Sequence, residues 1–296
     1  MTRREFLRRS ALAALGLSAC SLNIPEAERR ALERTGARKR VIVVGAGLAG
    51  LAAGYELTQA GHDVTIVEAR AYPGGRVHTL REPFADGLYA EAGANFIPDN
   101  HHFTLGYVRL FDLPLEPVFP RSAGKLYHVR GQRITLTGGA QVAWPFELTP
   151  EEQSLGLSGM WRKYLGTALN EAKDLTAGPL VEKYDRMSAA DFLRARGASP
   201  GAVALLGVGY LDLSGDGIES YSALLMLRDL ALRRGEKETY AIRGGNDLLP
   251  RAFASRLAGR IRYNAPVVRV EQSERAASVV IRRDGGHERL TADRVV

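Results

Sequence analysis

Three glycines and one glutamate are the residues whose types and spacing most directly suggest chemistry. Gly45, Gly47 and Gly50 have the spacing G-x-G-x-x-G and follow the β-branched run at residues 41–44. The first glycine allows a turn, the second lets backbone approach a pyrophosphate, and the third lets a helix pack closely on a strand. Glu68 follows roughly 20 residues later, where a carboxylate can accept hydrogen bonds from a ribose. The pattern predicts a dinucleotide-binding site.

These residues need a strand, a helix and a second strand to position them, and the sequence supplies all three. Residues 41–44 predict a buried strand, the Ala-rich residues 51–60 predict a helix, and residues 62–67 predict a second strand that ends at Glu68. The helix N-terminus would offer its unpaired N–H groups and its positive dipole end to the phosphates. We therefore expect a βαβ unit.

A second glycine pair follows the second strand. Gly74-Gly75 allow another close approach of backbone, and Arg76 can bind a phosphate through two hydrogen bonds. Residues 88–96 predict a short strand that leads into a turn of small residues. Glu91 in this segment has the chemistry of a general base, but we expect it to hold the turn in place instead.

Composition limits the class of protein. The chain has 296 residues, 45% of them hydrophobic, and 32 glycines, which is typical of a soluble α/β protein with a substantial core. Its net charge is +7, but the arginines are scattered and no nucleic-acid-binding module is recognisable, so we expect no nucleic-acid partner. The single cysteine excludes an internal disulfide or a cysteine-based metal cluster, and we predict no metal site.

The first residues predict export. Residues 1–20 combine a twin-arginine motif, Arg3-Arg4, with a short apolar segment, which is typical of a signal peptide. About ten apolar residues are too few to span a bilayer. Residues 17–20 also resemble a lipobox, in which a lipidated Cys20 would tether the protein to a membrane. Cleavage of the signal peptide without lipidation is the alternative. We expect a periplasmic or membrane-anchored protein, with residues 21–39 as a linker.

The middle of the chain has a different pattern. Residues 101–239 are mixed and mostly helical, which predicts a partial substrate-binding domain inserted into the first domain. Asn100 is predicted to cap a helix over residues 101–111. Residues 125–136 predict a β-hairpin around Gly131-Gln132.

The pattern returns to strands near residue 240. Residues 278–283 and 289–296 predict two paired strands, and the chain stops inside the second one. We predict an α/β fold: a Rossmann-type dinucleotide-binding domain, with a parallel sheet plus a β-meander, built from residues 40–100 and 240–296. The domain of residues 101–239 would be its α+β insertion.

These motifs together resemble the flavin-containing amine oxidase family, which includes monoamine, polyamine and L-amino-acid oxidases. Its N-terminal FAD signature is matched by the glycine motif, Glu68-Ala69-Arg70 and Gly74-Gly75-Arg76-Val77. Its turn against the flavin ring is matched by Gly93-Ala94-Asn95-Phe96. Its return to the FAD domain is matched by Ile242-x-Gly244-Gly245 and Asn264-x-Pro266-Val267. The resemblance extends from about residue 40 to residue 296 and is weakest in the middle.

The resemblance implies FAD as the cofactor. The residues expected to bind it are Gly45, Gly47, Leu48, Ala49, Gly50, Glu68, Ala69, Arg70, Gly75, Arg76, Gly93, Ala94, Asn95, Phe96 and Val267, the last through its backbone to adenine. The implied reaction is oxidation of the C–N bond of a small amine to an imine, with O2 as the final electron acceptor. The cofactor would do this chemistry. The protein would bind and orient the cofactor and the substrate, and would keep water out of the site.

Two departures from the family pattern qualify this expectation. Where L-amino-acid oxidases carry an arginine that binds the substrate carboxylate, this chain has Phe96, so we expect an amine rather than an α-amino acid. The family's flavin-proximal lysine and its substrate-binding aromatic pair would lie beyond Val296, so no catalytic residue can be assigned. We therefore expect a fragment or a truncated gene product. Another FAD oxidoreductase, of the protoporphyrinogen-oxidase or phytoene-desaturase type, and a non-catalytic FAD-binding remnant are the alternatives.

Overall fold

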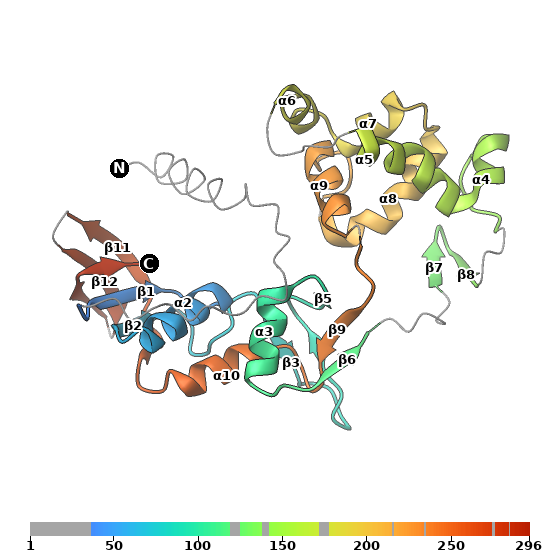
Figure 1. Cartoon of the computed structure of the whole chain (residues 1–296). Coiled ribbons are helices and arrows are strands. Elements are labelled where there is room, and N and C mark those ends of the chain that lie inside the picture. Colours follow the sequence, from blue (N-terminus) through green and yellow to red (C-terminus); the bar gives the residue numbers. More distant parts are fainter. Residues whose placement is uncertain are drawn as a thin grey trace. The chain divides into compact units, whose positions relative to one another are not determined.

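The computed structural model describes residues 37–118, 125–137, 142–171, 178–214, 216–233, 235–273, 276–283 and 285–296 (Figure 1). These residues form two compact units. One unit, called the cradle unit below, comprises residues 37–118 and 237–296, and the other, called the helical unit, comprises residues 125–236. The predicted signal peptide at residues 1–20, with Cys20, and most of the predicted linker lie outside the described residues.

A four-stranded parallel sheet forms the centre of the cradle unit. The strand order is β10 (Ile261–Arg262), β2 (Asp63–Val67), β1 (Arg40–Val44) and β14 (Arg294–Val295). Helix α2 (Leu48–Gln59) begins three residues earlier than the sequence predicts, because the turn after β1 is very tight. On one face of the sheet, side chains of β1 and β2 pack with those of α2 and the neighbouring helices in one apolar core. The predicted βαβ unit is therefore present.

Residues 267–292 form a three-stranded antiparallel meander of β11 (Val267–Gln272), β12 (Ala277–Arg283) and β13 (Gly286–Ala292). The sequence predicts one strand over residues 289–296, and this is wrong. The segment is divided at Asp293, whose carboxylate accepts a hydrogen bond from the N–H of Arg40. Before this point the chain belongs to the meander, and after it β14 pairs with β1.

Short strands and two helices complete the cradle unit. They are β3 (Thr79–Leu80), β4 (Ala90–Glu91), β5 (Ile97–Pro98), α3 (His102–Leu110), β6 (Leu115–Pro117), β9 (Thr239–Ile242) and α10 (Leu248–Arg256). Strand β9 pairs with both β5 and β6, so it joins segments that are more than a hundred residues apart in the sequence. The predicted cap at Asn100 is wrong, because His101 is the N-cap of α3 and its side chain makes no capping hydrogen bond.

The helical unit begins with the predicted hairpin. Strands β7 (Lys125–Val129) and β8 (Gln132–Leu136) are joined by Arg130-Gly131, both with positive φ, so the turn lies one residue earlier than predicted. The helices are α4 (Pro150–Trp161), η1 (Arg162–Gly166), α5 (Thr167–Glu171), α6 (Pro179–Asp185), α7 (Ala189–Ala195), α8 (Pro200–Ser214) and α9 (Ala223–Arg233). Both tryptophans of the chain, Trp144 and Trp161, pack against the core of this unit.

A buried carboxylate joins helices of this unit that are distant from one another in the sequence. Glu152 is 1% exposed and accepts hydrogen bonds from the N–H groups of Thr149 and Ser199 and from the hydroxyls of Tyr164 and Ser199. Burial alone would raise the pKa of Glu152, but these hydrogen bonds outweigh it and lower the pKa to about 2. The ionised side chain therefore fastens α4 to the start of α8 and to the π-helical turn η1.

The α/β class with a parallel sheet and a β-meander is confirmed. The compact units divide the chain near residues 120 and 237, and α3 packs in the core of the cradle unit. The limits at residues 100 and 239, taken as limits of functional domains, stay predictions. Within the part of the chain that the structure describes, no helix is both long and apolar enough to cross a membrane.

Candidate functional site

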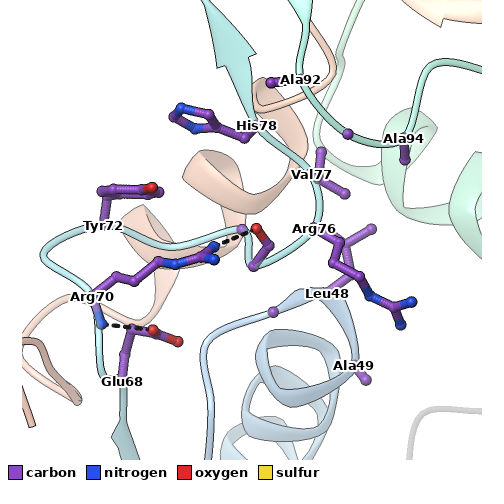
Figure 2. Close-up of a pocket in the computed structure, with 14 residues that line it drawn as sticks. Leu48, Ala49, Glu68, Arg70, Tyr72, Arg76, Val77, His78, Ala92 and Ala94 are labelled. Atoms are coloured by element: carbon purple, nitrogen blue, oxygen red, sulfur yellow. Dashed lines mark hydrogen bonds between the residues drawn. The ribbon is translucent and has the colours of Figure 1, made fainter. Parts of the chain in front are cut away.

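A cavity of about 1090 Å³ lies in the cradle unit, at the carboxyl ends of β1 and β2 (Figure 2). This is the edge of a parallel sheet at which α/β proteins bind ligands. Nine predicted FAD-binding residues line the cavity: Gly47, Leu48, Ala49, Glu68, Arg70, Gly75, Arg76, Gly93 and Ala94. The remaining lining residues are Tyr72, Gly74, Val77, His78 and Ala92.

The floor of the cavity is made of two glycine segments in contact. Gly47 is the N-cap of α2, and Leu48 and Ala49 are the first helical residues, whose N–H groups have no partner within the helix. The N–H of Gly74 donates to the carbonyl oxygen of Ala46 at 2.8 Å. A Cβ on Gly75 would lie 3.2 Å from the Cα of Gly47, so the two segments approach as closely as glycines allow. The result is a floor of closely packed backbone at the N-terminus of α2.

The other two glycines of the motif do not line the cavity but shape the turn beneath it. Gly45 has φ +99°, a conformation that other residues rarely adopt, and its N–H donates to the carbonyl oxygen of Val67 at 2.8 Å. A Cβ on Gly50 would lie 2.0 Å from the carbonyl oxygen of Gly45. Helix α2 can therefore start directly above β1 only because position 50 has no side chain.

Glu68 lies at one end of the cavity and is 7% exposed. One carboxylate oxygen accepts from the N–H of Ala46 at 2.6 Å, and the other accepts from the N–H of Arg70 at 2.8 Å. Each oxygen keeps a second lone pair, because a carboxylate offers about four acceptor positions. The backbone thus fixes the orientation of the carboxylate and leaves it able to accept further hydrogen bonds from hydroxyl groups.

Two arginines line the cavity in different ways. The guanidinium of Arg70 donates to the carbonyl oxygen of Gly75 at 2.7 Å and lies over the ring of Tyr72. Arg76 is exposed, and its guanidinium makes no hydrogen bond or ion pair with another described residue. Figure 2 shows the hydrogen bond that Arg70 donates as a dashed line, and it draws no dashed line from the guanidinium of Arg76. Arg76 is therefore the available cation for a phosphate, while Arg70 stabilises the second glycine segment.

Figure 2 shows Ala92 and Ala94, in the turn after β4, on the opposite side of the cavity from Glu68. Gly93 and Ala94 line the cavity, whereas Asn95 and Phe96 are outside its lining. A Cβ on Gly93 would lie 2.0 Å from the carbonyl oxygen of Arg76, and the same oxygen accepts from the N–H of Ala94 at 3.1 Å. The turn is thus pressed against the backbone of the Gly-Gly-Arg segment.

Two predicted residues near the Glu68 end also lie outside the cavity lining. Ala69 is exposed, and Val267 is the partly buried first residue of β11. The segment before Val267 nevertheless runs beside Glu68 and Arg70, because Ala265 and Asn264 donate their N–H groups to the carbonyl oxygens of these two residues, at 2.8 and 3.1 Å. The meander therefore begins next to the Glu68 end of the cavity.

Tyr72 and His78 also line the cavity, and the sequence pattern does not predict them as site residues. Their rings stack with a centroid distance of 5.0 Å, and both line the main cavity and a second cavity of about 430 Å³ beside it. Their positions on either side of Gly-Gly-Arg were the only signal in the sequence, and nothing in the motif specifies aromatic rings there. Among the described residues, no group of three or more acidic, histidine or cysteine side chains could hold a metal ion.

These features fit a dinucleotide. The cavity has an acceptor for ribose hydroxyls at one end, the N-terminus of α2 and a cation in the middle, and an apolar turn at the other end. Its volume is large even for a cofactor site. The fold and this cavity define a Rossmann-type dinucleotide-binding protein.

Comparison with known proteins then identifies the family. The model of the family described as flavin containing amine oxidoreductase matches residues 48–296, so the chain belongs to this family. FAD is therefore the dinucleotide that the cavity would hold.

Sequence relatives and solved structures agree with this assignment. An L-amino-acid oxidase from Pseudechis australis is 32% identical over 252 residues, which cover 84% of this chain and 48% of the relative. A putrescine oxidase solved with putrescine bound is 25% identical, has a TM-score of 0.67, and is matched over 88% of this chain and 57% of its own length. A cyclohexylamine oxidase from Brevibacterium oxydans IH-35A has a TM-score of 0.68 at 22% identity, over 88% of this chain and 57% of its own, which shows a shared fold. The chain spans about half the length of the curated relatives that it matches.

Proposed function

We propose that this chain is the FAD-binding part of an oxidoreductase that oxidises the C–N bond of a small amine to an imine, with O2 as electron acceptor. The observation that carries the proposal is the continuous cavity from Glu68, across the paired glycine segments, to the turn at Gly93-Ala94. One extended cofactor with a ribose, two phosphates and a planar ring system fits this sequence of surfaces.

Each group would have a distinct role. Glu68 would accept hydrogen bonds from ribose hydroxyls, and the N–H groups at the start of α2 would bind the pyrophosphate together with Arg76. The turn at Gly93-Ala94 would lie against the ring system. FAD bound here would supply the two-electron oxidation of the amine, and the protein would orient the cofactor and keep water away from it.

The substrate is the finer part of the proposal. We propose an amine rather than an α-amino acid, because Phe96, which is 44% exposed, cannot bind a carboxylate. An α-amino acid is the second candidate, since the relative from Pseudechis australis is an L-amino-acid oxidase. A carboxylate would then need a cation from elsewhere in the protein.

Two measurements test the proposal. The purified chain incubated with FAD should take up one equivalent and show a flavin spectrum after gel filtration; absence of bound flavin would contradict cofactor binding. The full-length protein should then release peroxide with a panel of primary and secondary amines. Turnover of α-amino acids without turnover of amines would reverse the substrate assignment. Bound flavin with no turnover of either class would favour a non-catalytic module.

We further propose that residues 1–20 direct export by the twin-arginine route, which carries folded proteins and so suits a protein that binds its cofactor before export. Replacing Arg3 and Arg4 together by lysine should keep the protein in the cytoplasmic fraction. Membrane association that is lost in Cys20→Ser would indicate lipidation, and a soluble periplasmic protein with an unmodified Cys20 would argue against it.

A further inference from the structure

The turn at the far end of the cavity is held by a side chain that belongs to a distant part of the sequence. Asn246 lies just before α10 and is 4% exposed. Its side-chain NH2 group donates to the carbonyl oxygens of Ala94 and Asn95, at 2.9 and 3.0 Å. Its side-chain oxygen accepts from the N–H of Ile242 at 2.9 Å. Two carbonyl acceptors on one side and an N–H donor on the other fix the orientation of the amide.

Asn246 is itself held by a network of buried and half-buried polar groups. Its own N–H donates to one carboxylate oxygen of Glu91 at 2.7 Å, and the other oxygen of Glu91 accepts from the hydroxyl of Thr79 at 2.9 Å. The hydroxyl of Thr79 accepts in turn from the N–H of Asp247 at 3.1 Å. Glu91 therefore holds the turn through Asn246, which gives a physical basis for the structural role expected of it.

Charged side chains form the far end of this network. The two oxygens of Asp247 accept from the guanidinium of Arg81, at 2.8 and 3.0 Å, and Arg251 also pairs with this carboxylate. Burial alone would raise the pKa of Asp247, but the two arginines and Thr79 outweigh it, and the net effect is a lowered pKa. A Cβ on Gly245 would lie 2.6 Å from Thr79, so only glycine lets this segment approach β3.

The position of the turn is transmitted to the middle of the cavity. The N–H of Ala94 and the bare Cα of Gly93 both meet the carbonyl oxygen of Arg76, and the N–H of Ala92 donates to the carbonyl oxygen of His78 at 2.8 Å. A displaced turn would therefore also displace the backbone of the Gly-Gly-Arg segment. The side chain of Asn246 therefore affects the position of both the turn and the Gly-Gly-Arg segment.

We propose that Asn246 is a positioning residue, which holds the turn of residues 93–95 at the distance and orientation that the flavin end of the cofactor requires. The proposal rests on the proposed FAD site and adds a residue outside its lining. The side chain of Asn246 donates to backbone oxygens of the turn and is outside the cavity lining, so its effect on the flavin would be indirect. The two donated hydrogen bonds are the essential contacts.

Two replacements of Asn246 separate these contacts from the rest of the network. Asn246→Asp keeps an acceptor for the N–H of Ile242 but places a second oxygen against the carbonyl groups of Ala94 and Asn95. Asn246→Leu removes all three side-chain hydrogen bonds and keeps the branched shape of the side chain. Glu152→Gln is the control, because it disturbs a buried network in the helical unit and should lower stability without touching the cavity.

The first measurement is amide hydrogen exchange in the absence of FAD. The N–H groups of Ala92 and Ala94 should exchange at least about tenfold faster in both Asn246 variants than in the unchanged protein, because opening of the turn becomes easier. The Glu152 control should leave both exchange rates unchanged. Equal exchange in the unchanged protein and the Asn246 variants would overturn the proposal, whatever FAD does.

The second measurement is the visible spectrum and the affinity for FAD. The Asn246 variants should show a shifted flavin absorption band and a dissociation constant raised roughly tenfold, as expected for two lost hydrogen bonds. The Glu152 control should bind FAD with an unchanged spectrum. Faster exchange with an unchanged spectrum and affinity would make Asn246 a stabilising residue only, and so overturn its positioning role.

Two further outcomes are distinguishable. If the unchanged protein binds no FAD, the proposed function fails, and the positioning role fails with it, while the exchange data still report on the turn itself. If Asn246→Leu does not fold, Asn246→Asp and the milder Glu91→Gln carry the test. Both variants should shift the flavin band in the same direction. If neither variant shifts the band, the proposal is overturned.

Discussion

Glu68 and Glu152 are both buried carboxylates, one in each compact unit. Glu152 accepts four hydrogen bonds from three residues of the helical unit and lines neither of the two cavities described above. Glu68 accepts two hydrogen bonds from backbone N–H groups and faces the large cavity. A carboxylate has about four acceptor positions, so Glu152 is saturated and Glu68 is half saturated.

The difference shows how burial alone fails to distinguish a structural carboxylate from a binding one. Each unsatisfied buried acceptor costs stability, so unused capacity at Glu68 is tolerable only where another donor or water can reach it. The saturated side chain holds helices together, and the half-saturated one leaves room for a ligand. The two units can therefore be tested with matched substitutions.

The largest effect is expected at Glu152. Its pKa of about 2 lies below the ordinary value of 4.5, so the ionised form stabilises the folded state above about pH 4.5, and this stabilisation is lost as the pH falls toward 2. Glu152→Gln should lower the free energy of unfolding at pH 7 by about 3 kcal/mol. Tryptophan fluorescence during urea unfolding measures this, because both tryptophans are in the helical unit. A difference between the two proteins that persists unchanged at pH 2.5 would contradict the explanation.

A matched pair of glycines gives the next effect. A Cβ on Gly93 in the cradle unit would lie 2.0 Å from the carbonyl oxygen of Arg76, and a Cβ on Gly201 in the helical unit would lie 2.0 Å from that of Glu147. Replacing either by alanine should cost roughly 2 to 3 kcal/mol of stability in its own unit. Hydrogen exchange of each unit measures the stability. Only Gly93→Ala should also weaken FAD binding. A similar loss of FAD affinity in Gly201→Ala would show that the cradle unit and the helical unit do not differ in this respect.

Glu68→Gln should chiefly affect binding. The amide keeps one acceptor oxygen for the two backbone N–H groups and loses the charge, so charge-assisted hydrogen bonds to the ribose are lost as well. Affinity for FAD should fall about 100-fold, which corresponds to roughly 2.7 kcal/mol. Equilibrium titration of FAD fluorescence measures it. Glu152→Gln should leave the affinity within about twofold, and the opposite ranking would mean that the roles of the two carboxylates are reversed.

Arg76 should give the smallest effect. Its guanidinium makes no hydrogen bond or ion pair with the described residues, so Arg76→Met should change stability by less than about 0.5 kcal/mol. FAD affinity should fall about tenfold, and the fall should shrink as salt is added, because salt screens an exposed phosphate contact. Arg70→Met is the contrasting variant, since it removes the hydrogen bond to Gly75. Equal salt dependence in the two variants would contradict the separate roles.

The glycine motif and the βαβ unit could be predicted because local backbone requirements determine them. Gly45 needs a positive φ, Gly50 needs to lack a side chain, and the apolar strands need burial. Each requirement leaves a residue type at a fixed spacing. The same reasoning predicted the glycine pair at Gly74-Gly75 and the strand ending at Glu68.

Contacts between distant segments could not be predicted in the same way. Asn246 holds a turn about 150 residues earlier in the chain, and Tyr72 and His78 become neighbours through the fold of the loop. The division of residues 289–296 into two strands depends on the pairing of Asp293 with Arg40. No local spacing specifies such partners, because they depend on which surfaces meet after folding.

The pairing of β1 has a consequence for the order of events during synthesis. One neighbour of β1 in the sheet is β2, which follows it closely in the sequence. Its other neighbour, β14, and the outer strand β10 both follow the helical unit in the sequence. The described helices of the helical unit, in contrast, lie within residues 150–233. We expect a nascent chain that ends before β10 to contain a protease-resistant helical unit beside an incomplete, protease-sensitive sheet. Competence to take up a cofactor would then arise only after the ribosome has delivered β10 and β14.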